Sequence, residues 1–389
     1  MKILMLLDGE YPPDVRVENE ISALAEEGHK IHLACTTRKN KPAEEHIGNV
    51  IIHRKVLSTF IYKSSVGCLR FPFYFNFWRK HVASLLKKEN FDIIHVHDLP
   101  LSQIGVELKK KYNIKLVIDL HENWPGLLKN ATHTQTFPGR IISSNNQWKK
   151  YEIKMLKEAD LVITVVNEAR DRVASLGISA KKLYVVSNSV NTDAIPVFER
   201  TREDNEFVIF YGGGLNRHRG IQVVLEAIKI LKDRDVKIKL DIAGSGSYKP
   251  VLEKQTQNLG IMQNVVFHGQ KSFNEMLKLL TEADAAIIPH LRNENNDATI
   301  PHKLSQYMYL NKPVISSDCI PLKRIISETG TGFIYKNNSP EELAGLLAKL
   351  YTERHLLAEK GLRGRKAVLA AYNWNIEKKK LLEAYKSAG

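Results

Sequence analysis

The sequence predicts an α/β protein made of two doubly wound domains, each with a parallel sheet that helices cover on both faces. Short apolar runs alternate with amphipathic helical patterns along nearly the whole chain of 389 residues, and such alternation is typical of parallel sheets. A polar stretch at residues 192–205 interrupts it once and indicates a linker. The length suits two domains of roughly 100–200 residues each. We therefore expect one domain at 1–192 and a second at 206–373.

The first half opens with an apolar run that enters a strand directly and is too short for a signal peptide. Later runs are similarly short, and helical patterns separate them. The predicted strands are residues 2–7, 31–35, 50–54, 92–96, 116–119, 161–165 and 183–186, and helical patterns include residues 17–27, 102–112, 147–158 and 168–175.

The second half repeats this alternation. A helix is expected at 222–232, and another from Pro301 to Leu310, because proline is tolerated in a first helical turn. Residues 374–389 form a last helical pattern. The predicted strands are residues 207–211, 237–243, 265–267, 285–288, 314–316 and 332–335.

Composition restricts the environment and the partners of the chain. Apolar residues make up 43%, which is enough for real cores, and no apolar run approaches the ~20 residues of a membrane span. The three cysteines are isolated, which fits a reducing cytoplasm. The net charge of +14 favours an anionic partner. A phosphorylated substrate and an anionic lipid surface are better supported than nucleic acid, since no zinc-finger spacing or aromatic RNA-binding signature is present.

Two segments of the second domain carry anion-binding features. Gly212-Gly-Gly214 follows a strand, and glycines let the backbone approach a phosphate closely. Arg217 and Arg219 come next and can bind phosphate bidentately, although Arg217 also fits a solvated helix start. Lys303 lies in the first turn of the helix that Pro301 begins, where free N–H groups favour an anion. Taken by itself, that helix is equally compatible with an ordinary crossover helix that only connects two parallel strands.

In the first domain, polar groups follow two predicted strands. Asp98 follows one and His121-Glu122 follows another, and ligands in such sheets bind outside the carboxyl ends of the strands. Asp98 is alternatively a helix cap. Arg16, in Tyr11-Pro-Pro-Asp14-Val-Arg16, suits a phosphate or acceptor contact, with pairing to Glu20 as the alternative. His95 is interpreted as structural.

Pro301-His-Lys303-Leu304, followed by Lys312-Pro313-Val314, resembles the sugar-nucleotide site of the retaining glycosyltransferases of family 4, whose two-domain fold is called GT-B. Many members read Pro-Asn-Lys-Leu-Phe-Glu-Tyr-Met and then Gly-Lys-Pro-Val-Ile here. The segments His95-Val-His-Asp98 and Asp119-Leu-His-Glu122 resemble the family's His-x-His-Asp and Asp-x-His-Glu segments.

Three positions depart from the family pattern. The paired glutamates would fall on Ala298 and Gln306. Gln306 can still hydrogen-bond a ribose diol, whereas Ala298 has no polar group, and Glu294 or Asp297 are candidates to replace it. Gly214 stands where the family usually has an arginine, with Arg217 as a candidate to compensate.

The resemblance implies a bacterial-type, retaining and metal-independent transfer of a sugar from a UDP-, GDP- or dTDP-sugar to a saccharide or lipid-linked saccharide, in cell-surface polysaccharide or glycoconjugate synthesis. It also implies that the departing diphosphate helps to deprotonate the acceptor, and that the last helix returns to the first domain. The implied catalytic residues are His121, Arg219 and Lys303; the donor-binding residues are Gly213, Gly214, Arg217, Gly244, Gly246, His268, Gly269, Ile300, Pro301, His302, Leu304 and Gln306; the acceptor-binding residues are Asp14, Arg16, Asp98 and Glu122.

Other functions stay open at this point. The same fold serves epimerases and phosphorylases, and the missing glutamates leave a non-catalytic nucleotide-sugar-binding protein as an alternative. A dehydrogenase is disfavoured, because the first turn, Asp8-Gly-Glu-Tyr11, lacks the dinucleotide glycine pattern. Asp233-Arg-Asp235 has the spacing of a metal-binding DxD, but it follows a helix and precedes a strand, at the wrong end of a sheet for a ligand. No metal is therefore expected.

Residues 69–88 interleave aromatic and basic side chains. Such a segment suits an anionic membrane surface, with rings in the acyl boundary and cations on headgroups. We expect Phe73, Phe75 and Trp78 to insert and the protein to sit on the inner face of the cytoplasmic membrane. The alternative is a helix whose rings pack on the sheet.

Overall fold

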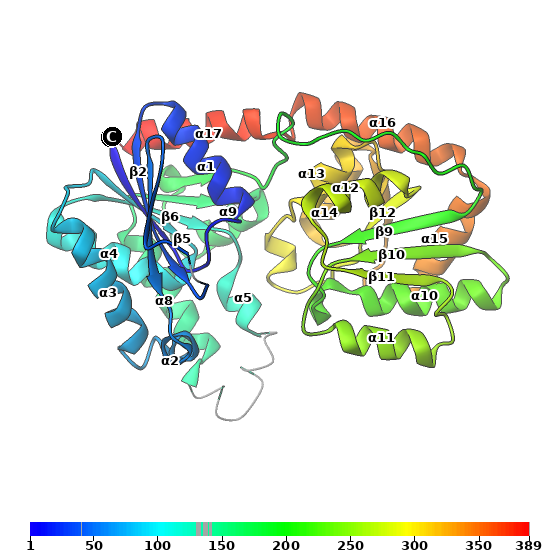
Figure 1. The fold of residues 1–389 in the computed structure, drawn as a ribbon, viewed down its shortest axis with the longest axis horizontal. Coiled ribbons are helices and arrows are strands. Elements are labelled where there is room, and N and C mark those ends of the chain that lie inside the picture. Colours follow the sequence, from blue (N-terminus) through cyan, green and yellow to red (C-terminus); the bar gives the residue numbers. More distant parts are fainter. Residues whose placement is uncertain (40, 130–133, 135–138, 140–141, 389) are drawn as a thin grey trace. The chain divides into compact units, whose positions relative to one another are not determined.

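The computed structural model describes residues 1–389 except 40, 130–133, 135–138, 140–141 and 389 (Figure 1). The chain divides into two compact units. Unit 1 comprises Met1–Ser187 together with Glu377–Gly389, and unit 2 comprises Asn188–Ile376. Residue 389, the last of the expected C-terminal helix, lies outside the described residues.

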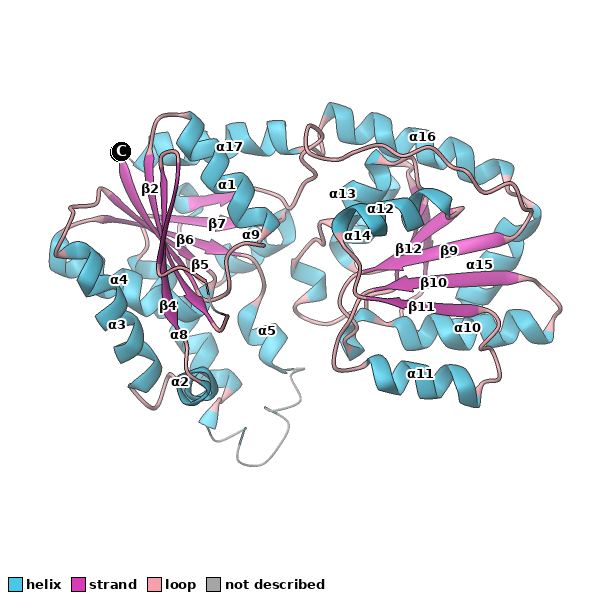
Figure 2. Cartoon of the chain, in the orientation of Figure 1, coloured by secondary structure: helices cyan, strands magenta, loops and turns pink. Residues whose placement is uncertain are grey.

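The strands described in unit 1 form a single sheet in the order β3-β4-β2-β1-β5-β6-β7-β8 (Figure 2). All neighbouring pairs are parallel except β3 and β4. The central strands are largely apolar because both of their faces are covered, although β5 also carries His95 and His97. The strands are β1 (Lys2–Leu7), β2 (Lys30–Thr37), β3 (Glu44–Ile47), β4 (Val50–Val56), β5 (Ile93–His97), β6 (Lys115–Leu120), β7 (Leu161–Thr164) and β8 (Leu183–Val185).

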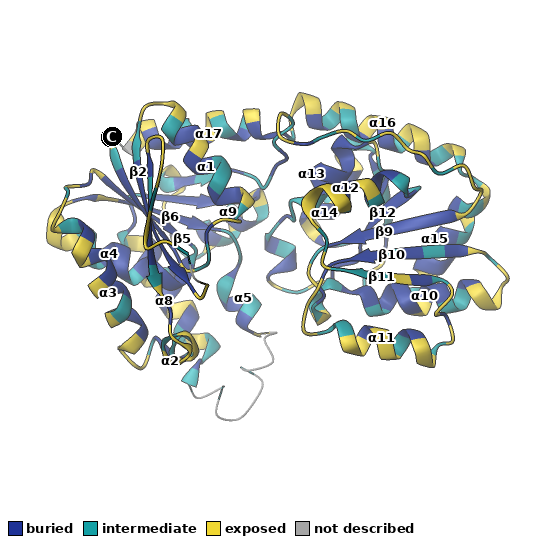
Figure 3. Ribbon diagram, in the orientation of Figure 1, coloured by how far each residue is buried: buried dark blue, intermediate teal, exposed yellow. Residues whose placement is uncertain are grey.

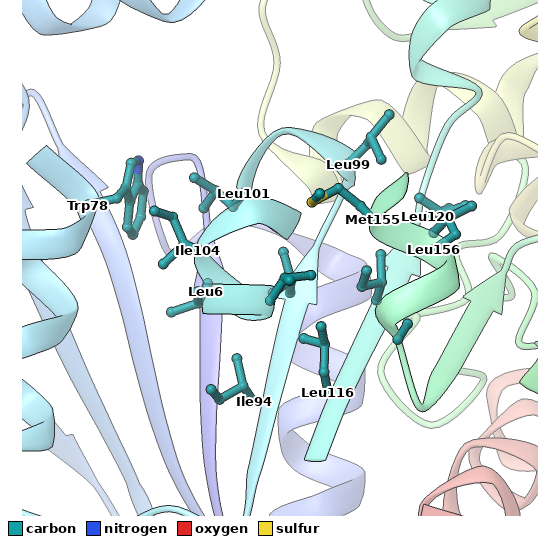
Figure 4. Packing of buried hydrophobic residues seen from close by; sticks show 14 of the residues in the cluster. Leu6, Trp78, Ile94, Leu99, Leu101, Ile104, Leu116, Leu120, Met155 and Leu156 are labelled. Carbon is teal, nitrogen blue, oxygen red and sulfur yellow. The ribbon is translucent and has the colours of Figure 1, made fainter. Parts of the chain in front are cut away.

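Helices cover both faces of this sheet and bury their apolar sides against it. Asp14 caps the first of them by accepting a hydrogen bond from the backbone N–H of Val17. At the core, Leu6, Ile94 and Leu116 of three neighbouring strands pack with side chains from the surrounding helices (Figure 4). The helices are α1 (Val15–Glu26), α2 (Thr59–Ser64), α3 (Phe73–Leu86), α4 (Ser102–Tyr112), α5 (Trp124–Lys129), α8 (Asn145–Glu158), α9 (Asn167–Ser175) and α17 (Trp374–Ala388).

The aromatic segment of α3 belongs largely to this core. Tyr74, Phe75 and Trp78 are buried, and Trp78 is fully enclosed in the cluster (Figure 4). The prediction that Phe75 and Trp78 insert into a membrane is therefore wrong, because helical spacing directs these rings onto the sheet. Phe71 and Phe73, at the start of the helix, are exposed. Among the described helices, none combines the length and apolarity needed to cross a bilayer.

The strands described in unit 2 form an all-parallel sheet in the order β11-β10-β9-β12-β13-β14. They are β9 (Phe207–Gly212), β10 (Ile238–Ala243), β11 (Val265–Gly269), β12 (Ala285–Ile288), β13 (Val314–Ser317) and β14 (Gly332–Tyr335). Apart from α13, which has no exposed residue, the covering helices are exposed on their outer sides and buried toward the sheet (Figure 3). They are α10 (Ile221–Asp233), α11 (Lys249–Asn258), α12 (Phe273–Glu282), α13 (Lys303–Tyr309), α14 (Ile320–Thr329), α15 (Pro340–Thr352) and α16 (His355–Ala370).

The structure confirms the predicted fold class, two Rossmann-like α/β units with parallel sheets. Two details differ from the sequence-based expectation. The short edge strand β3 has mostly exposed, polar residues and gave no strand pattern. Helix α13 begins at Lys303, two residues after Pro301, and Pro301 instead accepts a turn hydrogen bond from the backbone N–H of Leu304.

Candidate active site

Both sheets have a switch point, where successive strands are added on opposite sides of the first strand. In unit 2 the switch lies between β9 and β12, and in unit 1 between β1 and β5. The carboxyl ends of strands at a switch point are where open α/β sheets bind ligands. The predicted site residues Gly213 and Asp98 directly follow such strands, β9 and β5.

Backbone hydrogen bonds join the strand ends of unit 2 that carry the predicted glycines. The N–H of Gly213 donates to Ala243, the N–H of Gly244 to Gly269, and the N–H of Leu215 to Ser245. Gly214 and Gly246 lie in the same connected loops. The ends of β9, β10 and β11 therefore form one glycine-rich edge of backbone.

Lys303 reaches this edge from the start of α13. Its ammonium lies 4.1 Å from the centre of the Tyr211 ring. A Cβ on Gly213 would be only 2.7 Å from Lys303 Nζ, so the ammonium approaches because the position is glycine. No carboxylate among the described residues pairs with Lys303. Burial and the nearby Arg219 lower the pKa of Lys303 well below its usual value.

Arg219 lies between β9 and α10 and contacts His290, which follows β12. Arg219 Nη1 donates to His290 Nε2 over 3.2 Å. Burial, Arg219 and Lys303 hold the pKa of His290 well below its usual value, so this imidazole is neutral and orients Arg219 without competing charge. Across the described part of the chain, Arg219 has no carboxylate partner either. Arg217 is exposed. Two unneutralised cations thus lie at the switch point of unit 2.

The positions of the family's paired glutamates are buried. Gln306 lies on α13, and its side-chain amide has no hydrogen-bond partner within the described ranges. Ala298 is buried and apolar. Asp297 is engaged by Arg292 at 3.2 Å and by the backbone N–H of Ile320. Glu294 is exposed.

The remaining residues that the sequence predicts to bind the donor fall into two groups. His268, at the end of β11, is paired with Asp241 at 3.1 Å, and nothing lies within 4 Å of the position that a Cβ on the following Gly269 would take. Ile300 and Leu304 are buried and frame α13, and the Ile300 carbonyl accepts a hydrogen bond from the Asn188 side chain. Pro301 and His302, between them, are half-buried.

In unit 1, His121 lies just past β6 and is held by two aspartates. Its Nε2 is 2.9 Å from Asp119 Oδ2, and its backbone N–H donates to Asp98 Oδ1 over 3.1 Å. Asp98 occupies the cap position of the next helical turn but makes no cap hydrogen bond, so its side chain serves His121 instead. Glu122 follows, half-buried. His95 is fully buried against the Tyr385 hydroxyl, as a structural role requires.

Arg16 and Asp14 have structural contacts in addition to their predicted acceptor roles. Arg16 is buried and donates to both oxygens of Asp119 and to the carbonyl of Val186. It also pairs with Glu20 at 3.0 Å, the alternative expected from their spacing. Asp14 caps α1.

The DxD sequence lies away from the site. Asp233 ends α10 and pairs with Lys229, and Asp235 occupies the turn before β10, at the amino end of the sheet. This placement agrees with a solvated turn.

Sequence reasoning missed three contributors to the unit 2 site. Tyr211 lies under the Lys303 ammonium, the Tyr307 hydroxyl accepts from the backbone N–H of Gly212, and His290 orients Arg219. His290 follows a strand end, which is the signal that singled out His121. The two tyrosines lie within a strand and a helix and gave no such signal.

Together, the two Rossmann-like units with charged strand tips have the architecture of the GT-B glycosyltransferases. Residues 14–194 match the family model described as glycosyltransferase family 4, and residues 194–367 match that described as glycosyl transferases group 1. The protein is a glycosyltransferase built from these two domains. The matches favour this function over a non-catalytic binding protein.

Relatives and solved structures agree with this assignment. The chain is 24% identical to an uncharacterized glycosyltransferase of Methanocaldococcus jannaschii, over 100% of this chain and 98% of that protein. Sucrose-phosphate synthase of Thermosynechococcus elongatus has the same fold, with a TM-score of 0.81, 17% identity and coverage of 99% and 98%. HepE of Anabaena in complex with UDP-glucose superposes with a TM-score of 0.72 at 13% identity, covering both chains fully.

Proposed function

We propose that the protein transfers a sugar, with retention of configuration and without a metal, from a nucleotide-sugar donor to a saccharide or lipid-linked saccharide. One observation carries this proposal. Lys303 and Arg219 converge on the glycine-rich strand ends of unit 2, and neither has a carboxylate partner among the described residues. Two half-buried cations without counter-ions need an anion to compensate them.

A diphosphate satisfies this site better than a single carboxylate. Arginine binds phosphate oxygens bidentately, and lysine supplies a compact charge beside it. Gly213 itself adds no side chain beside the Lys303 ammonium, which lies 2.7 Å from the position that a Cβ would occupy. As the bond to the sugar breaks, negative charge grows on the diphosphate, and preorganised cations stabilise that charge most in the transition state. The two cations therefore serve binding and catalysis.

The rest of the donor is assigned from the residues beside the diphosphate site. Gln306 has an unengaged amide suited to the ribose diol, and the backbone at Gly269 offers open space for the base. The fold shared with HepE, solved with UDP-glucose, supports a uridine nucleotide among the candidates. By the resemblance to family 4, His121 contacts the transferred sugar, and Asp14, Arg16, Asp98 and Glu122 are on the acceptor side.

The donor proposal predicts thermal stabilisation by the correct nucleotide sugar. A panel of UDP-, GDP- and dTDP-sugars should raise the melting temperature by about 5–10 °C for the preferred donor at ~100 times its Kd, because only the native state binds it. Glucose and inorganic phosphate are the controls for the sugar and for a bare anion. Absence of stabilisation by every nucleotide sugar at millimolar concentration would contradict the proposal.

We also propose that unit 1 docks on an anionic membrane, through a surface that keeps only the start of the expected segment 69–88 and adds residues of α2. Three exposed rings, Phe60, Phe71 and Phe73, form an aromatic patch, and a fourth exposed ring, Tyr62, lies on the same helix α2 as Phe60; the exposed fractions of the four are between 48% and 61%. Phe73 lies 5.5 Å from Phe60 and 6.5 Å from Phe71, measured between ring centres, and the Arg38 guanidinium lies over Tyr62.

The charge around the aromatic patch and its position in unit 1 both suit binding to a lipid surface. Residues 46–88 contain no aspartate or glutamate, and Lys63 and Arg70 are exposed beside the rings. Arg38 follows β2 and α2 follows β4, and both strands run parallel to β6, which His121 follows. The aromatic patch therefore lies at the same edge of the sheet as His121. A lipid-linked acceptor held in a bilayer would approach that edge.

Replacing the aromatic residues of the patch with serine should release the protein from vesicles. Each ring that leaves the acyl boundary costs on the order of 1.5 kcal/mol or more, so Phe60→Ser, Phe71→Ser and Phe73→Ser together should lower the fraction that sediments with anionic liposomes at least about tenfold. Binding should also weaken in 1 M salt, where the Debye length is ~3 Å. The matched control is Ile47→Ser with Tyr112→Ser, two exposed apolar residues at the opposite edge of the sheet. Equal loss in the control, or equal sedimentation with neutral liposomes, would contradict docking.

A further inference from the structure

Two histidines and two carboxylates meet in the interior of unit 1, below the strand tip that His121 follows. Glu20 comes from α1, His95 and His97 come from β5, and Asp119 comes from β6. We call these four residues the His–carboxylate cluster. Each is buried, and one nitrogen or oxygen atom of each lies within 4.8 Å of those of the other three. Imidazole nitrogens and carboxylate oxygens are the ligands of zinc and of related divalent ions.

Four distances describe the geometry of the cluster. Glu20 Oε2 lies 3.7 Å from His95 Nε2 and 4.0 Å from His97 Nδ1. Asp119 Oδ2 lies 4.0 Å from His95 Nε2 and 3.7 Å from His97 Nδ1. These separations are too long for hydrogen bonds. In a tetrahedral zinc site neighbouring ligand atoms are about 3.3–3.6 Å apart, so shifts of roughly a few tenths of an ångström would bring all four atoms onto one ion.

Polar atoms of the cluster lack hydrogen-bond partners. Both carboxylate oxygens of Glu20 and the Nε2 atom of His95 make no hydrogen bond to any described residue, although both side chains are fully buried. A buried polar group is costly when it is unsatisfied, and most such groups in proteins have a partner. A cation between Glu20 Oε2 and His95 Nε2 supplies the missing interaction to both atoms at once.

Tyr385 and Arg16 hold the cluster from outside, as outer-shell groups do in metal sites. The Tyr385 hydroxyl lies 2.5 Å from His95 Nδ1. In the tautomer with its proton on Nδ1, His95 donates to this hydroxyl, and the lone pair of Nε2 is available to a metal. Arg16 Nη2 lies 3.0 Å from Glu20 Oε1 and 2.7 Å from Asp119 Oδ1. The guanidinium therefore holds one oxygen of each carboxylate, while the other oxygen faces the two histidines.

An ion network without a metal is the competing explanation, and it centres on Asp119 Oδ2. Arg16 Nε donates to this oxygen over 2.8 Å. His121 Nε2 lies 2.9 Å from the same oxygen and 3.3 Å from His97 Nδ1. This network accounts for Asp119 but leaves the Glu20 carboxylate without a hydrogen bond. Asp119 is accordingly the weakest of the four ligands, because its Oδ2 must share a metal with two hydrogen-bond donors.

We propose that the His–carboxylate cluster binds one divalent transition-metal ion such as zinc. The ion would join α1 to β5 and β6 below the strand tip that His121 follows, and so stabilise the position of that tip. The inference goes beyond the proposed function and does not depend on it. The donor phosphates are assigned to Lys303 and Arg219 in unit 2, so the transfer step itself stays metal-independent.

The metal content of protein purified without a chelator tests the proposal directly. Elemental analysis should find about one equivalent of a transition metal per chain, as expected for a single site. Glu20→Gln and His95→Gln should each lower the affinity for zinc at least about tenfold, since even the loss of an outer-shell partner costs that much. His32→Gln is the matched control, because His32 is a similarly buried histidine on the neighbouring strand β2 and contacts His53 instead; this variant should keep its metal.

The unmodified protein decides the question even if the ligand variants fail to fold. Chain produced in zinc-depleted medium with Co²⁺ should show the visible absorption of a protein-bound cobalt site. Chain produced without either metal should gain about 5–10 °C in melting temperature with Zn²⁺ at ~100 times its Kd. Absence of bound metal, of the cobalt spectrum and of this stabilisation would overturn the proposal.

The variants also locate the ion. Unchanged affinity in folded Glu20→Gln and His95→Gln would overturn the proposal, because the metal would then bind elsewhere. Loss of metal in Asp233→Asn instead would assign it to the turn before β10. Sugar transfer by a chain that binds no metal would overturn this inference and leave the proposed function intact. One bound equivalent without transfer from any nucleotide sugar would support this inference and contradict the proposed function alone.

Discussion

Lys303→Ala and Arg219→Ala should each lower the rate of sugar transfer on the order of 10²-fold or more, the scale of losing one preorganised group that stabilises developing charge. Both cations lie at the switch point of unit 2 without a carboxylate partner among the described residues, so neither has an evident structural ion pair to lose. The loss should appear in kcat, because the charge on the leaving diphosphate is greatest in the transition state. Initial rates with a saturating nucleotide sugar measure it.

Three comparisons make this test specific. Lys303→Arg keeps a cation and should retain more activity than Lys303→Ala. Lys323→Ala removes an exposed lysine of α14 in the same unit and should leave the rate unchanged. Stabilisation by the nucleotide diphosphate alone should shrink in Lys303→Ala and Arg219→Ala. Rates close to those of the unmodified protein in both variants would remove the diphosphate assignment.

Gly220→Ala should destabilise unit 2 by several kcal/mol and abolish most activity. Gly220 has a φ of +75° and is the N-cap residue before α10, and a Cβ there would lie 1.7 Å from the carbonyl oxygen of Pro289. A side chain in the left-handed region costs about 1–2 kcal/mol by itself. The collision with a backbone atom cannot be relieved by a side-chain rotation, and forced backbone shifts add about 1–3 kcal/mol or more. The same shift would separate Arg219 from His290.

Gly260→Ala is a matched control for this substitution. Gly260 has a φ of +65°, nearly the same conformation, but nothing lies within 4 Å of the position of its Cβ. Denaturant unfolding of both variants separates the cost of the left-handed conformation from the cost of the collision. Gly260→Ala should lose only the stability that the left-handed conformation costs. Equal loss of stability in the two variants would show that the close approach of Gly220 to Pro289 is unimportant.

Most strands and the ends that carry the site were predictable from local patterns. The apolar runs that became β1 and β12 are short and bounded by polar residues, because a strand covered on both faces favours apolar side chains along its length. His121 was found because it directly follows such a run. Edge strand β3 was missed because its mostly exposed residues have no need to be apolar.

The aromatic segment shows where local reasoning fails. Phe71, Phe73, Phe75 and Trp78 share one sequence pattern, yet the first two are exposed and the last two are buried. Their separation depends on where α3 begins and on which of its faces meets the sheet, and neither follows from composition. Phe60 joins the exposed rings from another helix, a contact that the sequence does not encode locally.

The sequence by itself determined the α/β class, the order of its elements and the chemical types at the strand tips, because hydrophobic periodicity and glycine placement are local properties. Only the tertiary structure decided which groups are paired. It placed Arg16 against Asp119, left Lys303 and Arg219 without counter-ions in the described chain, and set His290 beside Arg219. Burial, pairing and the resulting pKa values depend on distances between residues far apart in the chain, and those distances exist only once the sheets are assembled.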